Sequence, residues 1–292
     1  ARTAARRAGA SAPPRGAGRS GSRLNVTSTE ARSYVSYLQG VQRDREQQMA
    51  AALGRAPQVH LRMQYALNAV IVEMTEAEAS RVAAMSGVRM IERYREYALD
   101  TDLGMPIIGA PPVWNGTNPG AAGPYKGEGM VVGIIDTGIN FGSPSFSATG
   151  PVDGYAHVNP LGSGTYLGTC ASGGIDDGRC NAKLIGGYDF VCGAPVNACT
   201  TSGLREEPGF GDTNGHGSHT ASTVAGNTRS VTYAGNNLQI SGAAPHANII
   251  AYDVCYTVVA TGQGSCPNTA TAAAVNQAVL DGIVDAINYS IG

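Results

Sequence analysis

Two short segments carry side chains that could do acid–base chemistry together. The first, VVGIIDTGIN at residues 131–140, is an apolar run that ends on Asp136. The second, GHGSHTAS at residues 215–222, contains His216 between two glycines. A buried carboxylate can fix the tautomer of a histidine and stabilise its cationic form, and that histidine can then take the proton of a serine hydroxyl. The pair therefore indicates part of a nucleophilic triad.

The elements around these segments must bring Asp136 and His216 together, because 80 residues separate them. The continuous apolar run at residues 129–136 predicts a parallel strand that is covered on both faces. Functional groups gather outside the carboxyl ends of such strands. The segment GHGSHTASTVAGN predicts a turn that opens a helix with His216 at its start, where flanking glycines would let the backbone pack tightly around the imidazole. We therefore expect the imidazole to lie against the carboxylate at one edge of a sheet.

The other elements of this part of the chain alternate between strand and helix. Residues 141–211 read as mostly loop. Two further buried strands and one alanine-rich helix are predicted, in the segments ANIIAYDV at 247–254, DGIVDAINYSIG at 281–292 and TATAAAVNQAVL at 269–280. The alternation predicts an α/β domain with a parallel sheet.

The chain before residue 102 has a different pattern and predicts a small α+β unit with helices on one face of an antiparallel sheet. Thr75 and Glu78 form a capping box for its second helix. A first strand would have to come from residues 24–26. The predicted elements are a helix at 31–53, strands at 58–65 and 67–74, a helix at 75–87 and a strand at 88–99.

Charge is distributed unevenly and excludes some classes of protein. Residues 1–24 hold six arginines and no acid, which predicts a disordered tail. From residue 102 onward five basic residues stand against 13 acidic ones. An acidic folded part argues against nucleic-acid binding. No apolar run approaches the ~20 residues of a membrane span, and the start lacks the apolar stretch of a signal peptide.

All six cysteines lie after residue 169, and none forms a close C-x-x-C pair that would indicate zinc. Their even number in loop-rich segments favours disulfides and an oxidising compartment, so the protein is expected to be secreted. Pairing between sequence neighbours is the natural expectation: Cys170–Cys180, Cys192–Cys199 and Cys255–Cys266.

The order and type of these segments resemble the subtilases, the subtilisin-like serine proteases. The matching stretches are VVGIIDTGIN, GHGSHTAS, SGAAPHANIIAYDVC and DAINYSIG. By this resemblance Asp136 and His216 are two triad members, and the substrates are polypeptides. Ser290, Ile291 and Gly292 would belong to the strand whose backbone pairs with the bound peptide. The long segment between Asp136 and His216 resembles the branch of the family with a protease-associated domain.

The resemblance also divides the chain. Residues 25–101 resemble the family's inhibitor-type propeptide, a ferredoxin-like α+β unit that helps the protease to fold and occupies its cleft as an intramolecular inhibitor. Its tail, REYALDT, would lie along the cleft in extended form, with self-cleavage near Asp100 to Asp102. Residues 102–292 would then be the N-terminal portion of a subtilisin-like peptidase domain.

The family's serine, in a Gly-Thr-Ser-Met-Ala-like turn, does not occur in residues 1–292. We therefore expect this chain alone to be inactive, with the serine supplied by further sequence of the parent protein or by a second chain. Calcium binding is left open, because AGNNLQISG lies where one family calcium loop would be built but lacks carboxylates.

Three other interpretations remain at this point. Asp-Thr-Gly at 136–138 also fits an aspartic protease, which would need a second such motif. The propeptide region could act as a free protease inhibitor or folding helper beside an inactive remnant. His216 and His219 could form a metal pair, although we expect His219 to be structural. Asp212, four residues before His216, is expected to cap the helix.

Overall fold

The computed structural model describes residues 25–94, 96–97, 108–119, 123–233 and 236–291 of the 292. The chain divides into two compact units, one of residues 1–95 with 275–283 and the other of residues 96–274 with 284–292. The predicted tail at 1–24 and the predicted cleavage region at 100–102 lie outside the described residues.

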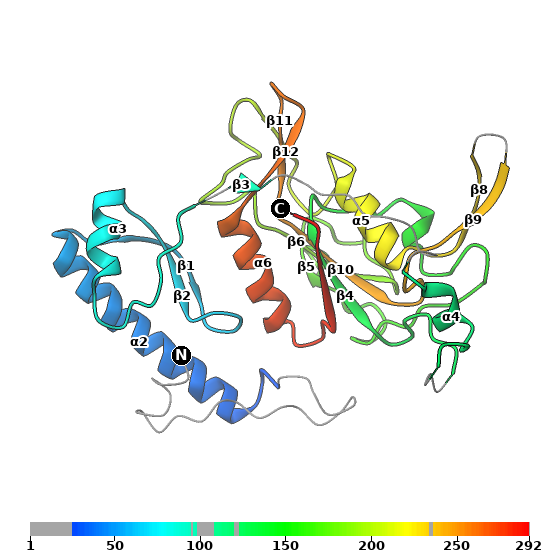
Figure 1. Ribbon diagram of the computed structural model, residues 1–292, viewed down its shortest axis with the longest axis horizontal. Helices are drawn as coiled ribbons and strands as arrows, with labels where there is room; N and C mark the ends of the chain where they lie inside the picture. Colours follow the sequence, from blue (N-terminus) through cyan, green and yellow to red (C-terminus); the bar gives the residue numbers. More distant parts are fainter. Residues whose placement is uncertain (1–24, 95, 98–107, 120–122, 234–235, 292) are drawn as a thin grey trace. The chain divides into compact units, whose positions relative to one another are not determined.

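The first unit is built from a long helix, a β-hairpin and a short helix, in agreement with the predicted order (Figure 1). Helix α2 begins after Ser28, whose side chain accepts a hydrogen bond from the N–H of Ala31 at 3.1 Å, and it ends at Gly54 in the left-handed conformation. Its buried Gln42 donates to the carbonyl of Met63 at 2.8 Å, which fixes the helix to the hairpin. The elements are α2 (Thr29–Leu53), β1 (Gln58–Met63), β2 (Ala69–Glu73) and α3 (Glu76–Ala83).

The capping box on α3 is confirmed, because Thr75 and Glu78 bond reciprocally. The described residues supply neither a first strand nor the first part of the strand that was predicted at 88–99. Asn25 and Val26 form no strand, and residues 88–94 form none either. In the second segment Met90 is 76% exposed, and Val88 and Ile91 are only partly buried. The described sheet of this unit therefore has two antiparallel strands, β1 and β2.

Of the strand that was predicted at 88–99, only two described residues form a strand, and these two pair within the second unit. Strand β3 (Glu96–Tyr97) runs antiparallel to β12 (Gln263–Pro267), and both strands belong to the second unit. The backbone of the segment that follows the first unit is thus hydrogen-bonded into the sheet of the second.

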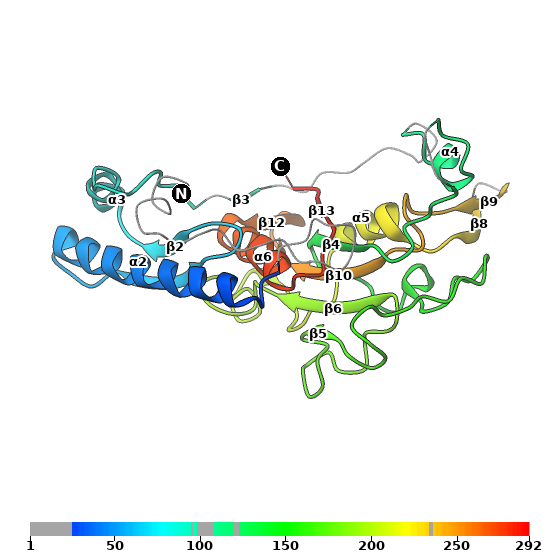
Figure 2. The same cartoon turned by 90° about the horizontal axis from the view of Figure 1, so that it is seen from below.

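The second unit is organised around a parallel sheet, which confirms the predicted α/β architecture (Figures 1 and 2). The strand order is β13-β4-β10-β6-β5, and every neighbouring pair is parallel. The two central apolar strands, β4 and β10, are buried at every position, as expected for a sheet that is covered on both faces. The strands are β4 (Val131–Asp136), β5 (Leu167–Gly168), β6 (Leu184–Asp189), β10 (Asn248–Asp253) and β13 (Ala286–Tyr289).

Strand β6 lies within the segment that was predicted to be mostly loop. The adjacent glycines Gly186 and Gly187 interrupt its apolar pattern and hide the strand from a periodicity argument. The structure supplies their reason, because a Cβ added at Gly187 would lie 2.1 Å from the ring of the fully buried Phe210. Strand β7 (Leu204–Arg205) and the 3₁₀ turn at Pro144–Phe146 are further elements of that segment.

Strand β13 was predicted to be buried, but Ile287 is 40% and Tyr289 42% exposed. Among the described residues, β13 pairs on one side only, with β4, so it forms the edge of the sheet. Helices α5 (His216–Ala225) and α6 (Asn268–Leu280) were predicted. The remaining elements are α4 (Ala110–Trp114), the hairpin β8 (Arg229–Tyr233) and β9 (Asn236–Ile240), and β11 (Tyr256–Val258).

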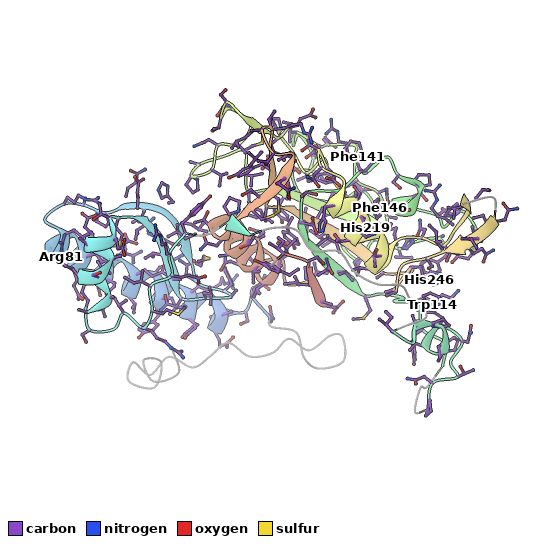
Figure 3. The ribbon with its side chains drawn as sticks, turned by 45° about the horizontal axis from the view of Figure 1, so that its top comes forward. Arg81, Trp114, Phe141, Phe146, His219 and His246 are labelled. Carbon is purple, nitrogen blue, oxygen red and sulfur yellow. A yellow bond between two sulfur atoms is a disulfide. The ribbon has the colours of Figure 1, made fainter. Side chains whose placement is uncertain are left out.

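The apolar core of this unit joins the sheet to α5 and to the loops that follow β4. Phe146 is fully buried in it, and Phe141 packs against its edge (Figure 3). The three predicted disulfides are confirmed: Cys170–Cys180, Cys192–Cys199 and Cys255–Cys266. In the described ranges, no helix is both long and apolar enough to cross a membrane.

A fully buried lysine lies just before β6. The Lys183 ammonium donates to the carbonyls of Pro245 at 2.8 Å and Ala247 at 3.0 Å. Burial lowers the pKa of Lys183 from 10.5 to about 7. The pKa of the neighbouring His157 is lowered to about 4, chiefly by burial and then by Lys183. Charge on this lysine is thus disfavoured in the folded state.

Folding stability should therefore rise between pH 7 and pH 10 through Lys183. In this window the unfolded chain keeps the proton that the folded chain has released, so unfolding takes up a proton and becomes less favourable as pH rises. Relative to Lys183→Met, the wild-type free energy of unfolding should climb by up to about 1.4 kcal/mol per pH unit. Urea unfolding at pH 7, 8 and 9 measures it. Lys126→Met, at the chain's other lysine, is the control, and parallel curves for wild type and Lys183→Met would contradict the prediction.

Candidate active site

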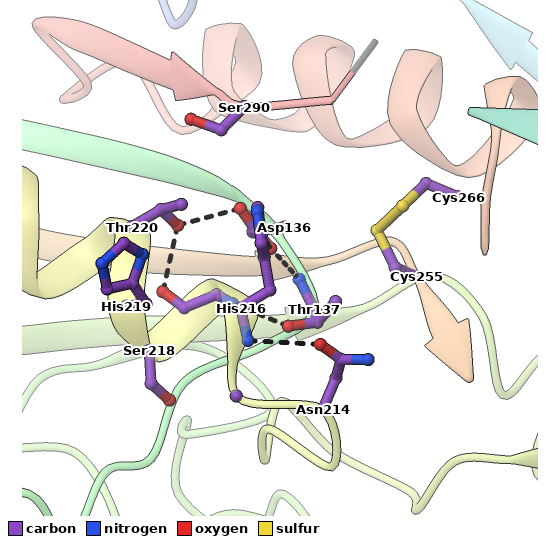
Figure 4. A network of polar contacts seen from close by, with 12 residues as sticks. Asp136, Thr137, Asn214, His216, Ser218, His219, Thr220, Cys255, Cys266 and Ser290 are labelled. Carbon is purple, nitrogen blue, oxygen red and sulfur yellow. Dashed lines mark hydrogen bonds and ion pairs between the residues drawn. A yellow bond between two sulfur atoms is a disulfide. The ribbon is translucent and has the colours of Figure 1, made fainter. Parts of the chain in front are cut away.

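The expected contact between the carboxylate and the imidazole is present (Figure 4). Asp136 is the last residue of β4 and is fully buried, and His216 is the first residue of α5. Nδ1 of His216 lies 2.8 Å from Oδ1 of Asp136. A carboxylate on Nδ1 holds the imidazole in the tautomer with its proton on that atom, which leaves Nε2 as the proton acceptor.

Glycines allow the two backbones to approach each other at this point, as predicted. Gly215 adopts φ +103°, which L side chains rarely adopt. A Cβ added at Gly217 would lie 2.2 Å from the carbonyl oxygen of Gly138, which itself has φ +88°. A larger residue at 217 would push the start of α5 away from the end of β4 and break the Asp136–His216 contact.

Both oxygens of the buried carboxylate are hydrogen-bonded. Oδ1 also accepts from the backbone N–H of Thr137 at 2.8 Å. Oδ2 accepts from Oγ1 of Thr220 at 2.8 Å (Figure 4). Three donors therefore satisfy both oxygens of this buried carboxylate. Thr220 was not predicted as a site residue, although its position four residues after His216 places both side chains on one face of α5.

Asp212 was expected to cap α5, and it accepts a hydrogen bond from the first turn of this helix, although the N-cap residue itself is Gly215. Its Oδ2 accepts from the N–H of Ser218 at 2.8 Å, and its Oδ1 accepts from the N–H of Gly215 at 2.7 Å. Oδ1 also accepts from the hydroxyl of Thr137 at 2.9 Å, and that hydroxyl in turn accepts from the N–H of Gly217 at 2.7 Å. The loop before α5 is therefore bonded to the residue that follows Asp136.

The predicted peptide-pairing residues follow β13. Tyr289 pairs with Ile135 in β4, so Ser290 and Ile291 come next to the end of the strand that carries Asp136. Ser290 exchanges a side-chain hydrogen bond with Asn288, and Ile291 is buried. Gly292 lies outside the described residues. The serines on α5 are engaged locally, Ser218 with Asp212 and Ser222 with the carbonyl of His219.

The possible metal ligands are sparse in the described part of the chain. One group has suitable spacing, Asp189 with Cys192 and Cys199, but both of these sulfurs are in a disulfide. His216 and His219 take part in no such group there, and His219 is exposed. The geometry therefore does not favour a metal hydrolase built on this histidine pair.

Further carboxyl groups gather beside the site, at the ends of the neighbouring strands. Asp253 ends β10 and is fully buried, and burial together with the charge of Glu206 raises its pKa well above its usual range. Burial likewise raises the pKa of Glu206 to about 7, with Asp189 and Asp212 adding repulsion. Asp136 differs because an imidazole and two further donors balance its charge.

Comparison with known proteins agrees with this geometry. The family model described as "Subtilase family" matches residues 127–292, which is 166 of 292 residues and so more than half of the chain. The chain is 31% identical over 233 residues to Subtilisin-like protease SBT2.4 of Arabidopsis thaliana, covering 78% of this chain and 27% of the relative. It is 30% identical over 295 residues to Subtilisin-like protease SBT3.5 of the same plant, covering 92% of this chain and 36% of the relative.

The chain thus spans between about a quarter and just over a third of the length of these curated relatives. The matched region contains the end of β4, the start of α5 and the strand β13. The sequence resemblance is confirmed: this chain belongs to the subtilase family of serine proteases.

Proposed function

We propose that the parent protein is a serine endopeptidase of the subtilisin type, in which Asp136 and His216 are two members of an Asp-His-Ser triad. The observation that carries the proposal is the 2.8 Å contact between Nδ1 of His216 and Oδ1 of the fully buried Asp136. His216 would take the proton of the serine hydroxyl as that oxygen attacks the peptide carbonyl, and would then give the proton to the leaving amine. The buried carboxylate would stabilise the imidazolium between these steps.

The serine would come from sequence of the parent protein beyond this chain or from a second chain. The length of the curated relatives leaves ample room for further sequence. Without a serine and the oxyanion donor that accompanies it, this chain alone should not hydrolyse peptides. The missing donor would by itself cost about 3 kcal/mol of transition-state stabilisation.

The proposed substrates are polypeptides bound in extended form. Ser290, Ile291 and Gly292 would offer backbone groups on one side of the peptide, next to the end of β4. Strand β12 would offer its backbone on the other side, since it already pairs with an extended segment, β3. An added strand is bound mainly through main-chain hydrogen bonds.

We further propose that residues 25–101 are an inhibitor-type propeptide and that the protein is made as a self-inhibited zymogen. The β3–β12 pairing supports this, because Glu96 and Tyr97 lie within the predicted cleft-binding tail. Within the first unit, the N–H of Tyr65 also donates to the side chain of Asn276 in α6 at 3.2 Å. Residues 102–292 would then be the front of the peptidase domain, and residues 1–24 a tail.

We also propose that the parent protein is secreted and that it belongs to one particular branch of the family. Three disulfides favour an oxidising compartment, so we place the parent protein outside the cell. The long segment between Asp136 and His216 is the reason for proposing the branch with a protease-associated domain. An aspartic protease is disfavoured because it needs two carboxylates that share a proton, whereas Asp136 contacts an imidazole.

Substitution of the two proposed triad residues in the full-length parent should abolish peptide hydrolysis. Asp136→Asn should lower kcat by about 10⁴-fold and His216→Ala by about 10⁶-fold, because each removes part of one proton-transfer unit. A fluorophosphonate should label the wild type, and pepstatin should not inhibit it. Hydrolysis of a fluorogenic peptide measures the rates.

Two matched variants control this experiment. Asp177→Asn, at an exposed aspartate, should stay within about threefold of wild type. His219→Gln should also remain active, whereas loss of activity in it together with sensitivity to chelators would support the metal hydrolase instead. Full activity of Asp136→Asn would refute the triad.

The propeptide proposal predicts where the chain is cut and what the released piece does. Mass analysis of the active protein should find a new N-terminus immediately after one of residues 100–102. The released piece should inhibit the mature enzyme, and a version that ends at residue 95, without β3, should inhibit at least about tenfold more weakly because it lacks the main-chain hydrogen bonds. Equal inhibition by both pieces would contradict the role of β3. An inhibitory piece from a parent with no hydrolytic activity would favour the free-inhibitor alternative.

A further inference from the structure

Helix α5 holds the proposed catalytic carboxylate at two points, one turn apart. His216 contacts Oδ1 of Asp136 from the first position of the helix, and Thr220 contacts Oδ2 from four positions later. Thr220 is only 3% exposed, so water does not compete for its hydroxyl. Within the described part of the chain, no other donor to Oδ2 is present.

The hydroxyl of Thr220 has one proton and two acceptors within reach. One is Oδ2 of Asp136 at 2.8 Å, and the other is the carbonyl of Gly217 at 3.2 Å in its own helix. A charged acceptor gives the stronger hydrogen bond, so the proton points to the carboxylate while Asp136 is ionised. The bond to Gly217 is the ordinary one for a threonine inside a helix.

The consequences for the imidazole follow from charge and geometry. A proton donated to Oδ2 offsets part of the negative charge of the carboxylate, which weakens its pull on the Nδ1 proton of His216. The same bond stops the carboxylate from rotating about its Cβ–Cγ bond and presenting the other oxygen. Without this donor, Oδ2 would be a buried and unsatisfied charged atom, which is costly in a dry site.

We propose that Thr220 is a positioning residue of the catalytic centre, which fixes the carboxylate of Asp136 through Oδ2 and tunes the proton affinity of His216. This role in catalysis rests on the proposed protease function, whereas the effect on the Asp136–His216 hydrogen bond does not. Nothing in the contact requires the serine.

The test compares Thr220→Val, which keeps the shape and removes the donor, with Thr220→Ser, which keeps the donor. Thr223→Val is the matched control, since Thr223 lies on the same helix and its hydroxyl donates to the carbonyl of His219 at 2.9 Å. The first readout is the proton NMR signal of His216 Nδ1–H in the 292-residue chain, assigned by its loss in His216→Gln. Thr220→Val should move this signal downfield, and Thr220→Ser should leave it near the wild-type position.

The second readout is kinetic and uses the full-length parent. Thr220→Val should lower kcat about tenfold with KM nearly unchanged, because one hydrogen bond to a charged group is worth roughly that much. The acidic limb of its kcat/KM profile should move to higher pH, because the imidazole keeps its proton longer. Thr220→Ser should restore both values to within about twofold of wild type.

Each outcome bears on the proposal. An unchanged Nδ1–H signal in Thr220→Val overturns it, and so does a loss of activity with an unmoved acidic limb and no rescue by serine. A shifted signal that serine restores, in a parent without hydrolytic activity, supports the positioning contact and refutes the protease function. If Thr220→Val does not fold, Thr220→Ala is read by the same two criteria.

Discussion

The burial of one carboxylate constrains everything around the candidate site. Asp136 is fully buried at the end of a parallel strand, where an isolated charge would be strongly destabilised. Three hydrogen-bond donors stabilise this buried carboxylate: a backbone N–H, an imidazole and a hydroxyl. Two of them come from α5, so the helix must start close to the strand. That closeness explains the glycine at 217, where a Cβ would lie 2.2 Å from the carbonyl oxygen of Gly138.

Several carboxyl groups lie at the same edge of the sheet, and each has different hydrogen-bond partners. Three neighbouring strands, β4, β10 and β6, end on Asp136, Asp253 and Asp189 in parallel register. Asp136 is neutralised by donors from α5. Asp189 accepts backbone N–H groups of the loop that follows it. Asp253 is the least compensated, and burial together with the charges of Glu206, Asp189 and Asp212 raises its pKa well above its usual range.

The sequence predicted the parts of the fold that are encoded locally. Apolar runs marked β4 and β10, capping residues marked α3, and the spacing of Gly215 and His216 marked the start of α5. The Asp136–His216 contact followed, because parallel strands bring their carboxyl ends to one edge. A contact of Asp212 with the start of α5 was expected from its position alone.

The failures of prediction have a common physical origin in contacts between distant segments. Strand β6 was missed because Phe210, far along the chain, requires a glycine at 187. Residues 88–94 were predicted to continue a strand, but they form none, and only Glu96 and Tyr97 of that segment pair, with β12. Thr220 looked like any helical threonine, since its significance depends on a carboxylate 84 residues away. Periodicity and capping motifs depend on residues close together in the sequence. They therefore cannot predict contacts between residues that are far apart in the sequence.

The boundary between the two units differs between the sequence pattern and the structure. The pattern of the sequence put a boundary near residue 101, whereas the contacts put it between residues 95 and 96. The difference is the segment that contains β3, which leaves the first unit and is hydrogen-bonded to β12 in the second. Main-chain pairing of this kind needs little from the side chains, so it leaves only a weak signal in the sequence. The pairing thus moves the boundary toward the start of the chain, because β3 takes its hydrogen bonds from a strand about 170 residues further along and not from its neighbours in sequence.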